Sequence, residues 1–212
     1  MSTIVRQLPG LSDYAQTLDA MREFTRSRTA ESNDELWLLQ HPPVFTLGLA
    51  ARLEHLLEPG PIPVVKTERG GQVTYHGPGQ LVAYTLIDLR RKGLGVKELV
   101  FRIEQSLIQT LEAFRIDARR VAGAPGVYVP LAGGHGSFAG LAKIAALGIK
   151  ISGGCSYHGA ALNVAMDLAP FSRIDACGYQ GLRSIDMASL GIKANVSELA
   201  DTLSERLLAH LG

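Results

Sequence analysis

Two cysteines, Cys155 and Cys177, are the thiols of this 212-residue chain, and either could act as a nucleophile. A thiolate attacks a carbonyl carbon readily once a neighbouring cation or base lowers its pKa. His158 follows Cys155 by three residues, but side chains three apart on a strand point to opposite faces. Cys177 lies in a non-periodic stretch, where loops often expose functional side chains. Because a free cysteine is more often a small buried apolar residue, residue chemistry alone leaves the choice open.

Lys143 stands in an otherwise apolar stretch, residues 141–148, and is a candidate base. Such a lysine either extends its ammonium to solvent or lies desolvated with a lowered pKa, and the pattern favours the solvent-exposed alternative. The histidines His41, His55 and His135 lack the spacing of zinc ligands, so we expect no metal site.

The densest group of polar residues and glycines is in residues 69–80, which read RGGQVTYHGPGQ. Its paired glycines let backbone N–H groups approach a ligand, while its arginine, threonine, tyrosine and histidine bring donors to the same place. The spacing matches neither the dinucleotide-binding motif nor the P-loop. Any one of these residues fits a plain hairpin with turn glycines equally well, but their density favours a binding segment.

The elements that must position these residues follow from hydrophobic periodicity. Helices are expected at 11–24, with Ser12 as N-cap, at 96–114, and at 196–211, with Asn195 as N-cap. Strands are expected at 36–39, 44–47, 62–66, 72–76, 80–89, 126–129, 142–147, 149–152 and 156–164. Residues 77–79 read as a hairpin-like connection, and residues 133–140 as a flexible loop. The pattern predicts an α+β fold, a mixed or antiparallel sheet flanked by helices, in a single domain over 1–212.

Composition excludes several classes of protein. Hydrophobic residues make up 46% and charged residues 19%, which argues against disorder. A net charge of +1 indicates no nucleic-acid or anionic membrane partner, and no apolar run is long enough to span a bilayer. Two cysteines and the lack of a signal-peptide pattern favour a cytoplasmic protein.

The run RGGQVTYHGPGQ resembles the signature of octanoyl-[acyl-carrier-protein]:protein octanoyltransferases, a family of lipoate biosynthesis. The resemblance continues through residues 41–48, 143–148, 154–159, 162–167 and 173–179, and covers about residues 36 to 190 in order. It implies the fold of biotin and lipoate protein ligases. It also implies transfer of an octanoyl group from octanoyl-acyl carrier protein to a lysine of lipoyl domains, through a cysteine thioester and without a cofactor. The implied acceptors are the lipoyl domains of 2-oxoacid dehydrogenase E2 subunits and the glycine cleavage H protein.

Matched residue by residue, the resemblance implies that Cys177 is the nucleophile and that Lys143 is its acid–base partner, half-buried beside it. Backbone N–H groups near Gly70 and Gly71 or after Cys177 are candidate oxyanion donors. The implied substrate contacts are Arg69, Gly70, Gly71, Gln72, Val73, Thr74, Tyr75, His76, Ala146, Leu147, Gly148, Gly159, Ala160 and Ala161.

The chain departs from the family pattern in three places. Ala176 precedes Cys177 where the family generally has proline, and Leu49 and Ala50 stand where an arginine is common. Residues 133–140 resemble an insertion, which we expect to be mobile and to gate the site. Three rival functions remain at this point: an ATP-using ligase on the same fold, a non-catalytic acyl-binding module and a cysteine hydrolase.

Overall fold

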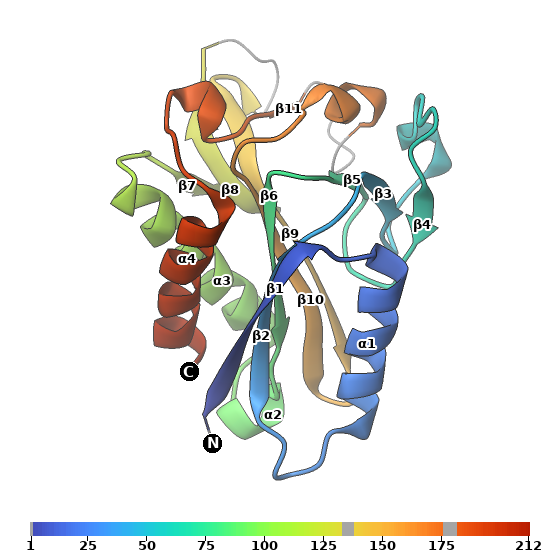
Figure 1. Ribbon diagram of the computed structural model, residues 1–212, viewed down its shortest axis with the longest axis vertical. Helices are drawn as coiled ribbons and strands as arrows, with labels where there is room; N and C mark the ends of the chain where they lie inside the picture. The colour runs from blue at the N-terminus through green and yellow to red at the C-terminus, as the bar shows by residue number, and fades with distance from the viewer. Residues whose placement is uncertain (1, 133–137, 176–181) are drawn as a thin grey trace.

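The computed structural model describes residues 2–132, 138–175 and 182–212 (Figure 1). Within these residues the main sheet has eight strands, in the order β1-β2-β6-β10-β9-β8-β7, with β11 added beside β9. Its strands are β1 (Thr3–Leu11), β2 (Asp34–Gln40), β6 (Gln80–Leu86), β7 (Arg119–Val121), β8 (Ala124–Pro130), β9 (Leu141–Ser152), β10 (Cys155–Asn163) and β11 (Arg183–Ser184). The β1–β2 and β9–β11 pairs are parallel and the others antiparallel, so the predicted mixed sheet is confirmed.

A smaller sheet, ordered β4-β3-β5, lies beside the main one. Its strands are β3 (Val44–Leu47), β4 (Val64–Lys66) and β5 (Val73–His76). The helices are α1 (Tyr14–Ser27), α2 (Leu89–Lys92), α3 (Val96–Ala113) and α4 (Val196–Leu211), with short 3₁₀ turns η1 (Leu53–His55), η3 (Ala169–Arg173) and η5 (Ala188–Leu190). In Figure 1, α3 and α4 lie together on one side of the main sheet and α1 on the other. No helix in the described part of the chain is long and apolar enough to cross a membrane.

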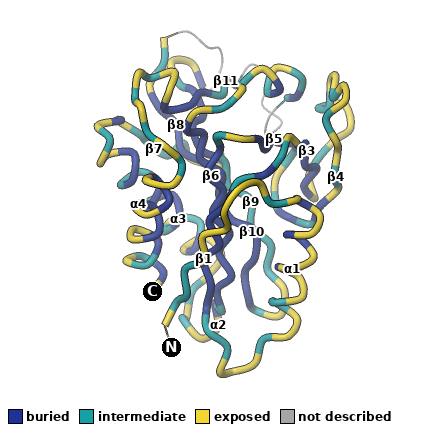
Figure 2. The backbone as a smooth tube through the Cα atoms, viewed as in Figure 1, coloured by how far each residue is buried: buried dark blue, intermediate teal, exposed yellow. Residues whose placement is uncertain are grey.

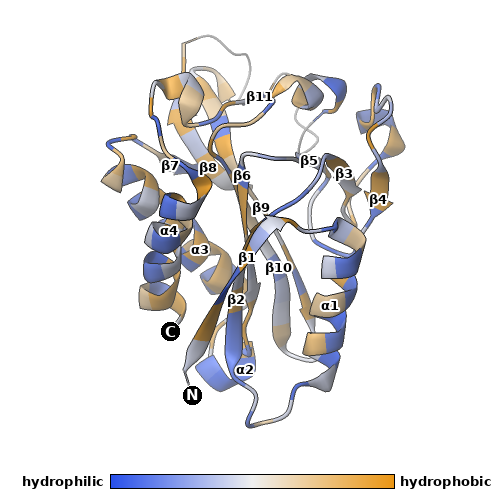
Figure 3. Ribbon diagram, in the orientation of Figure 1, coloured by the Kyte–Doolittle hydropathy of each residue, from blue (hydrophilic) through white to orange (hydrophobic). Residues whose placement is uncertain are grey.

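Two hydrophobic cores hold these layers together. On one face, Leu99, Ile103 and Leu107 repeat every four residues along α3 and are buried with leucines of α4 and of the sheet. On the other face, Tyr14 and Leu18 of α1 pack against residues of β2, β6 and β10. Figure 2 shows β2, β6 and β10 as largely buried, whereas the edge strand β1 is mostly exposed. In Figure 3, α1 and α4 carry both hydrophilic and hydrophobic residues, as amphipathic helices do.

The N-terminal segment differs from the prediction. Helix α1 begins at Tyr14 with Asp13 as its N-cap, whose Oδ1 accepts the N–H of Gln16 at 2.9 Å. Ser12 is not the cap: its N–H donates to the carbonyl of Gln40, which ties it to the end of β2. The sequence analysis did not predict β1, because this edge strand is largely exposed and lacks the alternation of a half-buried strand.

The expected hairpin between residues 72–76 and 80–89 is also wrong, because the two strands belong to different sheets. β5 pairs with β3, whereas β6 pairs with β2 and β10. Gly79 has φ +82°, and a Cβ there would collide with the carbonyl of Ala165. The turn therefore docks against the main sheet and redirects the chain instead of folding it back.

The other long elements agree with the predictions made from the sequence. Helix α3 spans Val96–Ala113, and α4 spans Val196–Leu211, where Asn195 Oδ1 accepts the N–H of Glu198 at 2.7 Å. The two strands expected at 142–147 and 149–152 are one continuous strand, β9, because Gly148 keeps its pairing with Gly159 of β10.

Candidate active site

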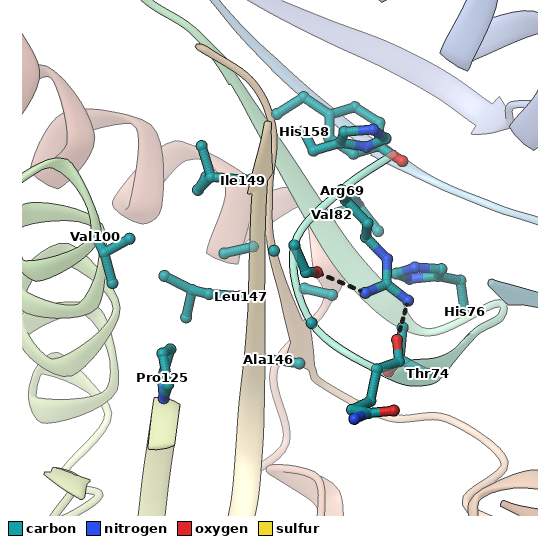
Figure 4. Close-up of a pocket in the computed structure, with 18 of the residues that line it drawn as sticks. Arg69, Thr74, His76, Val82, Val100, Pro125, Ala146, Leu147, Ile149 and His158 are labelled. Atoms are coloured by element: carbon teal, nitrogen blue, oxygen red, sulfur yellow. Dashed lines mark hydrogen bonds between the residues drawn. The ribbon is translucent and has the colours of Figure 1, made fainter. Parts of the chain in front are cut away.

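A cavity of about 440 Å³ occupies a gap beside β9 (Figure 4). β8 pairs with β9 no further along that strand than Ala145. Further along β9, the N–H of Gly70 donates to the carbonyl of Ile149 at 3.0 Å. The segment between these two attachments, Ala146 to Gly148, lines the cavity. Figure 4 accordingly shows lining side chains on both sides of the β9 ribbon.

The loop of residues 69–72, here called the 69–72 loop, is held in place by the side chain of Arg69. The guanidinium is buried and donates to the carbonyl oxygens of Thr46 (2.7 Å), Gln72 (2.8 Å) and Gly70 (3.0 Å). It therefore binds its own loop and the neighbouring strand β3. A Cβ on Gly148 would lie 2.9 Å from the Gly70 carbonyl oxygen, so glycine is needed where the loop meets β9.

The Gly70 N–H does not fit the oxyanion role expected of it, because Ile149 already accepts its hydrogen. The backbone N–H groups of Leu49 and Ala50 donate to the carbonyls of Arg69 and Gly71 at 2.9 and 3.1 Å. Leu49 and Ala50, where the resemblance led us to expect an arginine, thus support the 69–72 loop through their backbone, and the side chain of Leu49 is exposed.

The structure brings all but one of the residues expected to contact substrate together around this cavity, while their roles stay predictions. Those that line it are Arg69, Gly70, Gly71, Gln72, Val73, Thr74, His76, Ala146, Leu147, Gly148, Gly159, Ala160 and Ala161. Tyr75 does not line the cavity and packs between Phe45 and Phe171, each with ring centroids 5.5 Å from its own. Successive side chains of a strand alternate in direction, so Tyr75 faces away from the side on which Thr74 and His76 lie.

Lys143 also lines the cavity, with only 5% of its surface exposed. Its Nζ donates to the carbonyl of Pro125 at 3.1 Å and lies 5.1 Å from the centroid of the Tyr128 ring. The expectation that this lysine reaches solvent is therefore wrong. The strand pattern could not show this, because the carbonyl and the ring belong to β8, which pairs with β9 only in the folded chain.

Of the two candidate thiols, Cys155 lies in the described part of the chain. Cys155 is buried opposite Ser152, at the end of β9 remote from Lys143, and burial raises the pKa of its thiol. It is not among the residues that line the cavity, and this environment is that of an inert structural cysteine. Cys177 and Ala176 lie outside the described residues, as do residues 133–137 of the expected gating loop.

The sequence analysis missed several lining residues. They are Tyr14, Val82, Tyr84, Val96, Val100, Ala124, Pro125, Ile149 and His158. The sequence offered one partial signal: Val96 and Val100 lie four residues apart on the apolar stripe of α3, although this spacing is equally typical of a helix that faces a core.

A group of buried histidines and tyrosines lies at the α1 side of the cavity. Burial lowers the pKa of His41 to about 4 and the pKa values of His76 and His158 to about 3, so all three rings are neutral at pH 7. His41 contacts the Tyr84 hydroxyl at 2.7 Å through Nε2. His158 has φ +62° in a strand, a conformation that non-glycine residues rarely adopt. Tyr14, His76, Tyr84 and His158 line the cavity together with the Arg69 side chain, whereas His41 does not line it.

Comparison with solved structures identifies the class of fold. Lipoate-protein ligase A bound with ATP matches with a TM-score of 0.77 and 16% identity, covering 100% of this chain and 86% of that one. Biotin protein ligase from Aquifex aeolicus in complex with biotin and ATP matches with a TM-score of 0.55 and 12% identity, covering 99% of this chain and 70% of that one. The fold is therefore that of the lipoate and biotin protein ligases, as expected.

The family follows from sequence comparison. The model of the lipoyl protein ligase A/B catalytic domain matches residues 13–209. Octanoyltransferases from Methylibium petroleiphilum (55% identical, 97% of each chain) and Polynucleobacter necessarius (56% identical, 100% of this chain and 97% of the relative) match along nearly the whole length. This chain belongs to the lipoyl protein ligase A/B catalytic domain family, and it is an acyltransferase.

Proposed function

We propose that the chain, acting as one domain over residues 1–212, transfers an octanoyl group from octanoyl-acyl carrier protein to a lysine of a lipoyl domain. The relatives named octanoyltransferase support the reaction. The observation that carries the proposal is the 440 Å³ cavity, which places an apolar lining against a single buried lysine, Lys143. A cavity of this size and lining suits a medium-length acyl chain.

In the proposed reaction, the Cys177 thiolate attacks the carbonyl carbon of the carrier thioester. A new enzyme thioester forms, and the carrier thiolate leaves and takes a proton. The amine of the lipoyl-domain lysine then attacks the enzyme thioester, gives up a proton and forms an amide, while Cys177 is released as a thiolate. The first step exchanges one thioester for another and the second forms a more stable amide, so the sequence needs no ATP.

Lys143 supplies the charge and the proton transfer in this scheme. An ammonium beside a thiol favours the thiolate, and a lysine held at a fixed position can pass a proton between the thiol, the leaving group and the amine. The apolar walls of the cavity keep water from the enzyme thioester, which favours transfer over hydrolysis.

The proposed acceptors are the lipoyl domains of 2-oxoacid dehydrogenase E2 subunits and the glycine cleavage H protein. The proposed compartment is the cytoplasm, where a free thiol stays reduced. The family assignment supports lipoyl domains as a class of acceptor.

Intact mass spectrometry tests the proposal. Wild-type protein mixed with octanoyl-acyl carrier protein is expected to gain one octanoyl group, and to pass it to an apo lipoyl domain without ATP. The adduct should persist in Cys155→Ser and be lost in Cys177→Ser. An adduct that depends on Cys155, a requirement for ATP, or release of free octanoate in place of the amide would each contradict the proposal.

A further inference from the structure

Glu104 is a buried carboxylate on the face of α3 that borders the cavity. Val96 and Val100, which line the cavity, lie eight and four residues before it, so the three side chains share one face of the helix. Glu104 is only 6% exposed. A carboxylate buried to this extent requires strong hydrogen-bond donors.

Two donors meet the Glu104 carboxylate, one from each strand of the β7–β8 hairpin. Oε1 accepts the backbone N–H of Gly126 at 2.9 Å, and Oε2 accepts the Nε–H of Arg120 at 3.0 Å. Arg120 is itself fixed, because it donates to the Phe101 carbonyl at 3.0 Å and to Gln105 Oε1 at 2.9 Å. The carboxylate thus joins α3 to the hairpin at a set position.

The Gly126 N–H belongs to the same peptide group as the Pro125 carbonyl, which accepts a hydrogen bond from Lys143 Nζ at 3.1 Å. In a trans peptide the N–H and the C=O point in opposite directions. The Glu104 carboxylate and the Lys143 ammonium therefore lie at the two ends of one peptide group. Hydrogen bonds in series polarise one another, so the carboxylate makes the Pro125 carbonyl a stronger acceptor for the ammonium.

Gly126 makes this arrangement possible. Its φ is +138°, and a Cβ there would lie 2.8 Å from Lys143 Cε and 2.9 Å from the Ala145 carbonyl oxygen. The absence of a side chain lets the lysine pass directly over the peptide group.

We propose that Glu104 is a positioning residue, which holds the Lys143 ammonium at the cavity and stabilises its charged form through the Pro125–Gly126 peptide. Its consequence for catalysis rests on the proposed function: the charged lysine would keep Cys177 as a thiolate before the acyl group arrives. The contact between Glu104, the peptide and Lys143 stands independently of the acyl donor.

Competitive acetylation of lysines tests this proposal without requiring any transfer activity. Wild type and Glu104→Gln are treated with trace acetic anhydride over a series of pH values, and each lysine peptide is quantified by mass spectrometry. Because the neutral amine reacts, loss of the negative charge should raise acetylation of Lys143 about three- to tenfold near pH 8. Exposed Lys97 serves as the internal reference and should not change.

Two further variants control the result. Glu98→Gln removes an exposed carboxylate from the same helix, one that is paired with Arg102, and should leave Lys143 at the wild-type rate. Glu104→Asp keeps the charge on a shorter side chain and should give an intermediate rate, which a purely structural role would not produce. Thermal unfolding confirms that each variant is folded before labelling.

Equal acetylation of Lys143 in wild type and folded Glu104→Gln would overturn the proposal. The transfer assay adds a separate readout: Glu104→Gln should lower kcat while leaving KM for the acyl carrier unchanged. If Lys143 is acetylated faster in Glu104→Gln than in wild type but wild type transfers no octanoyl group, the proposed function fails and the positioning role of Glu104 stands. If wild type transfers the octanoyl group but acetylation of Lys143 is the same in wild type and Glu104→Gln, the positioning role fails and the proposed function stands.

Discussion

Gly70 donates its backbone N–H to the carbonyl of Ile149 at 3.0 Å, and this bond closes one end of the gap beside β9. The other end is closed where β8 stops pairing, at Ala145. Because β9 continues between the two points, the sheet remains intact while one edge of the strand is open to a ligand. The cavity is therefore a property of strand pairing, and its length depends on where the 69–72 loop attaches.

Replacement of Gly148 by alanine should weaken that attachment. The new Cβ would lie 2.9 Å from the Gly70 carbonyl oxygen, a backbone atom that cannot rotate away. We expect a loss of about 1–3 kcal/mol in the free energy of unfolding, measured by urea denaturation, and a raised KM for the acyl donor. Gly95→Ser is the matched control, because no atom lies within 4 Å of its Cβ and serine is favoured at a helix N-cap. An unchanged KM in Gly148→Ala would contradict the role of the loop.

Replacement of Gly126 by alanine should displace Lys143. The Cβ would meet Lys143 Cε at 2.8 Å, so the lysine must move to make room. A shift of about 1 Å in a catalytic group can lower the rate on the order of 100-fold, and we expect a loss of that size in kcat. Gly123→Ala in the same hairpin controls for backbone strain, since it also has positive φ but nothing within 4 Å. Equal loss of kcat in both variants would show that strain, and not the lysine, is responsible.

The buried histidines should make stability depend on pH. The folded-state pKa values of His41, His76 and His158 are about 4, 3 and 3, below the unfolded value of about 6.5. The unfolded chain therefore binds more protons below pH 6.5, and the stability present above that pH is lost as the pH falls towards the folded-state values. Each such histidine contributes a slope of up to about 1.4 kcal/mol per pH unit.

Urea denaturation between pH 7 and pH 5 measures this slope. His158→Asn should make the dependence of the free energy of unfolding on pH shallower, by the uptake of about one proton. Asparagine does not titrate, and it tolerates the positive φ at this position. A slope that does not respond to His158→Asn would show that other groups cause the acid sensitivity.

The wall formed by His158 should set the length of acyl chain that the cavity accepts. His158 pairs with Ile149 across β10 and β9, at the end of the cavity remote from Lys143. Glycine tolerates φ +62° and removes the ring, so His158→Gly should shift the preference from octanoyl towards decanoyl or longer donors. Ala161→Val, which adds bulk to the lining nearer Lys143, should shift it towards shorter donors. Competition between acyl donors of different length, with the products quantified by mass spectrometry, checks both variants. If their preference for chain length equals that of wild type, the end of the acyl chain does not lie at His158.

The sequence by itself determined the local features of this protein. The four-residue spacing of Leu99, Ile103 and Leu107 specified α3, and Asn195 specified the start of α4, because a helix face and an N-cap depend on neighbours within one or two turns. The segment at 69–80 was recognised for the same reason: its unusual residues are adjacent in the chain. The mixed sheet with flanking helices followed from the order of these elements.

Only the tertiary structure decided which of these elements meet. Hydrophobic periodicity indicates that one face of an element is buried, but it does not indicate which element covers that face. It therefore could not show that β5 and β6 belong to different sheets, or that Lys143 is buried. The link from Glu104 to Gly126 spans 22 residues of sequence, and it exists because the β7–β8 hairpin folds back over α3. The site depends on such distant contacts, since Lys143 of β9 is held by a carbonyl of β8, and Glu104 of α3 by donors from β7 and β8.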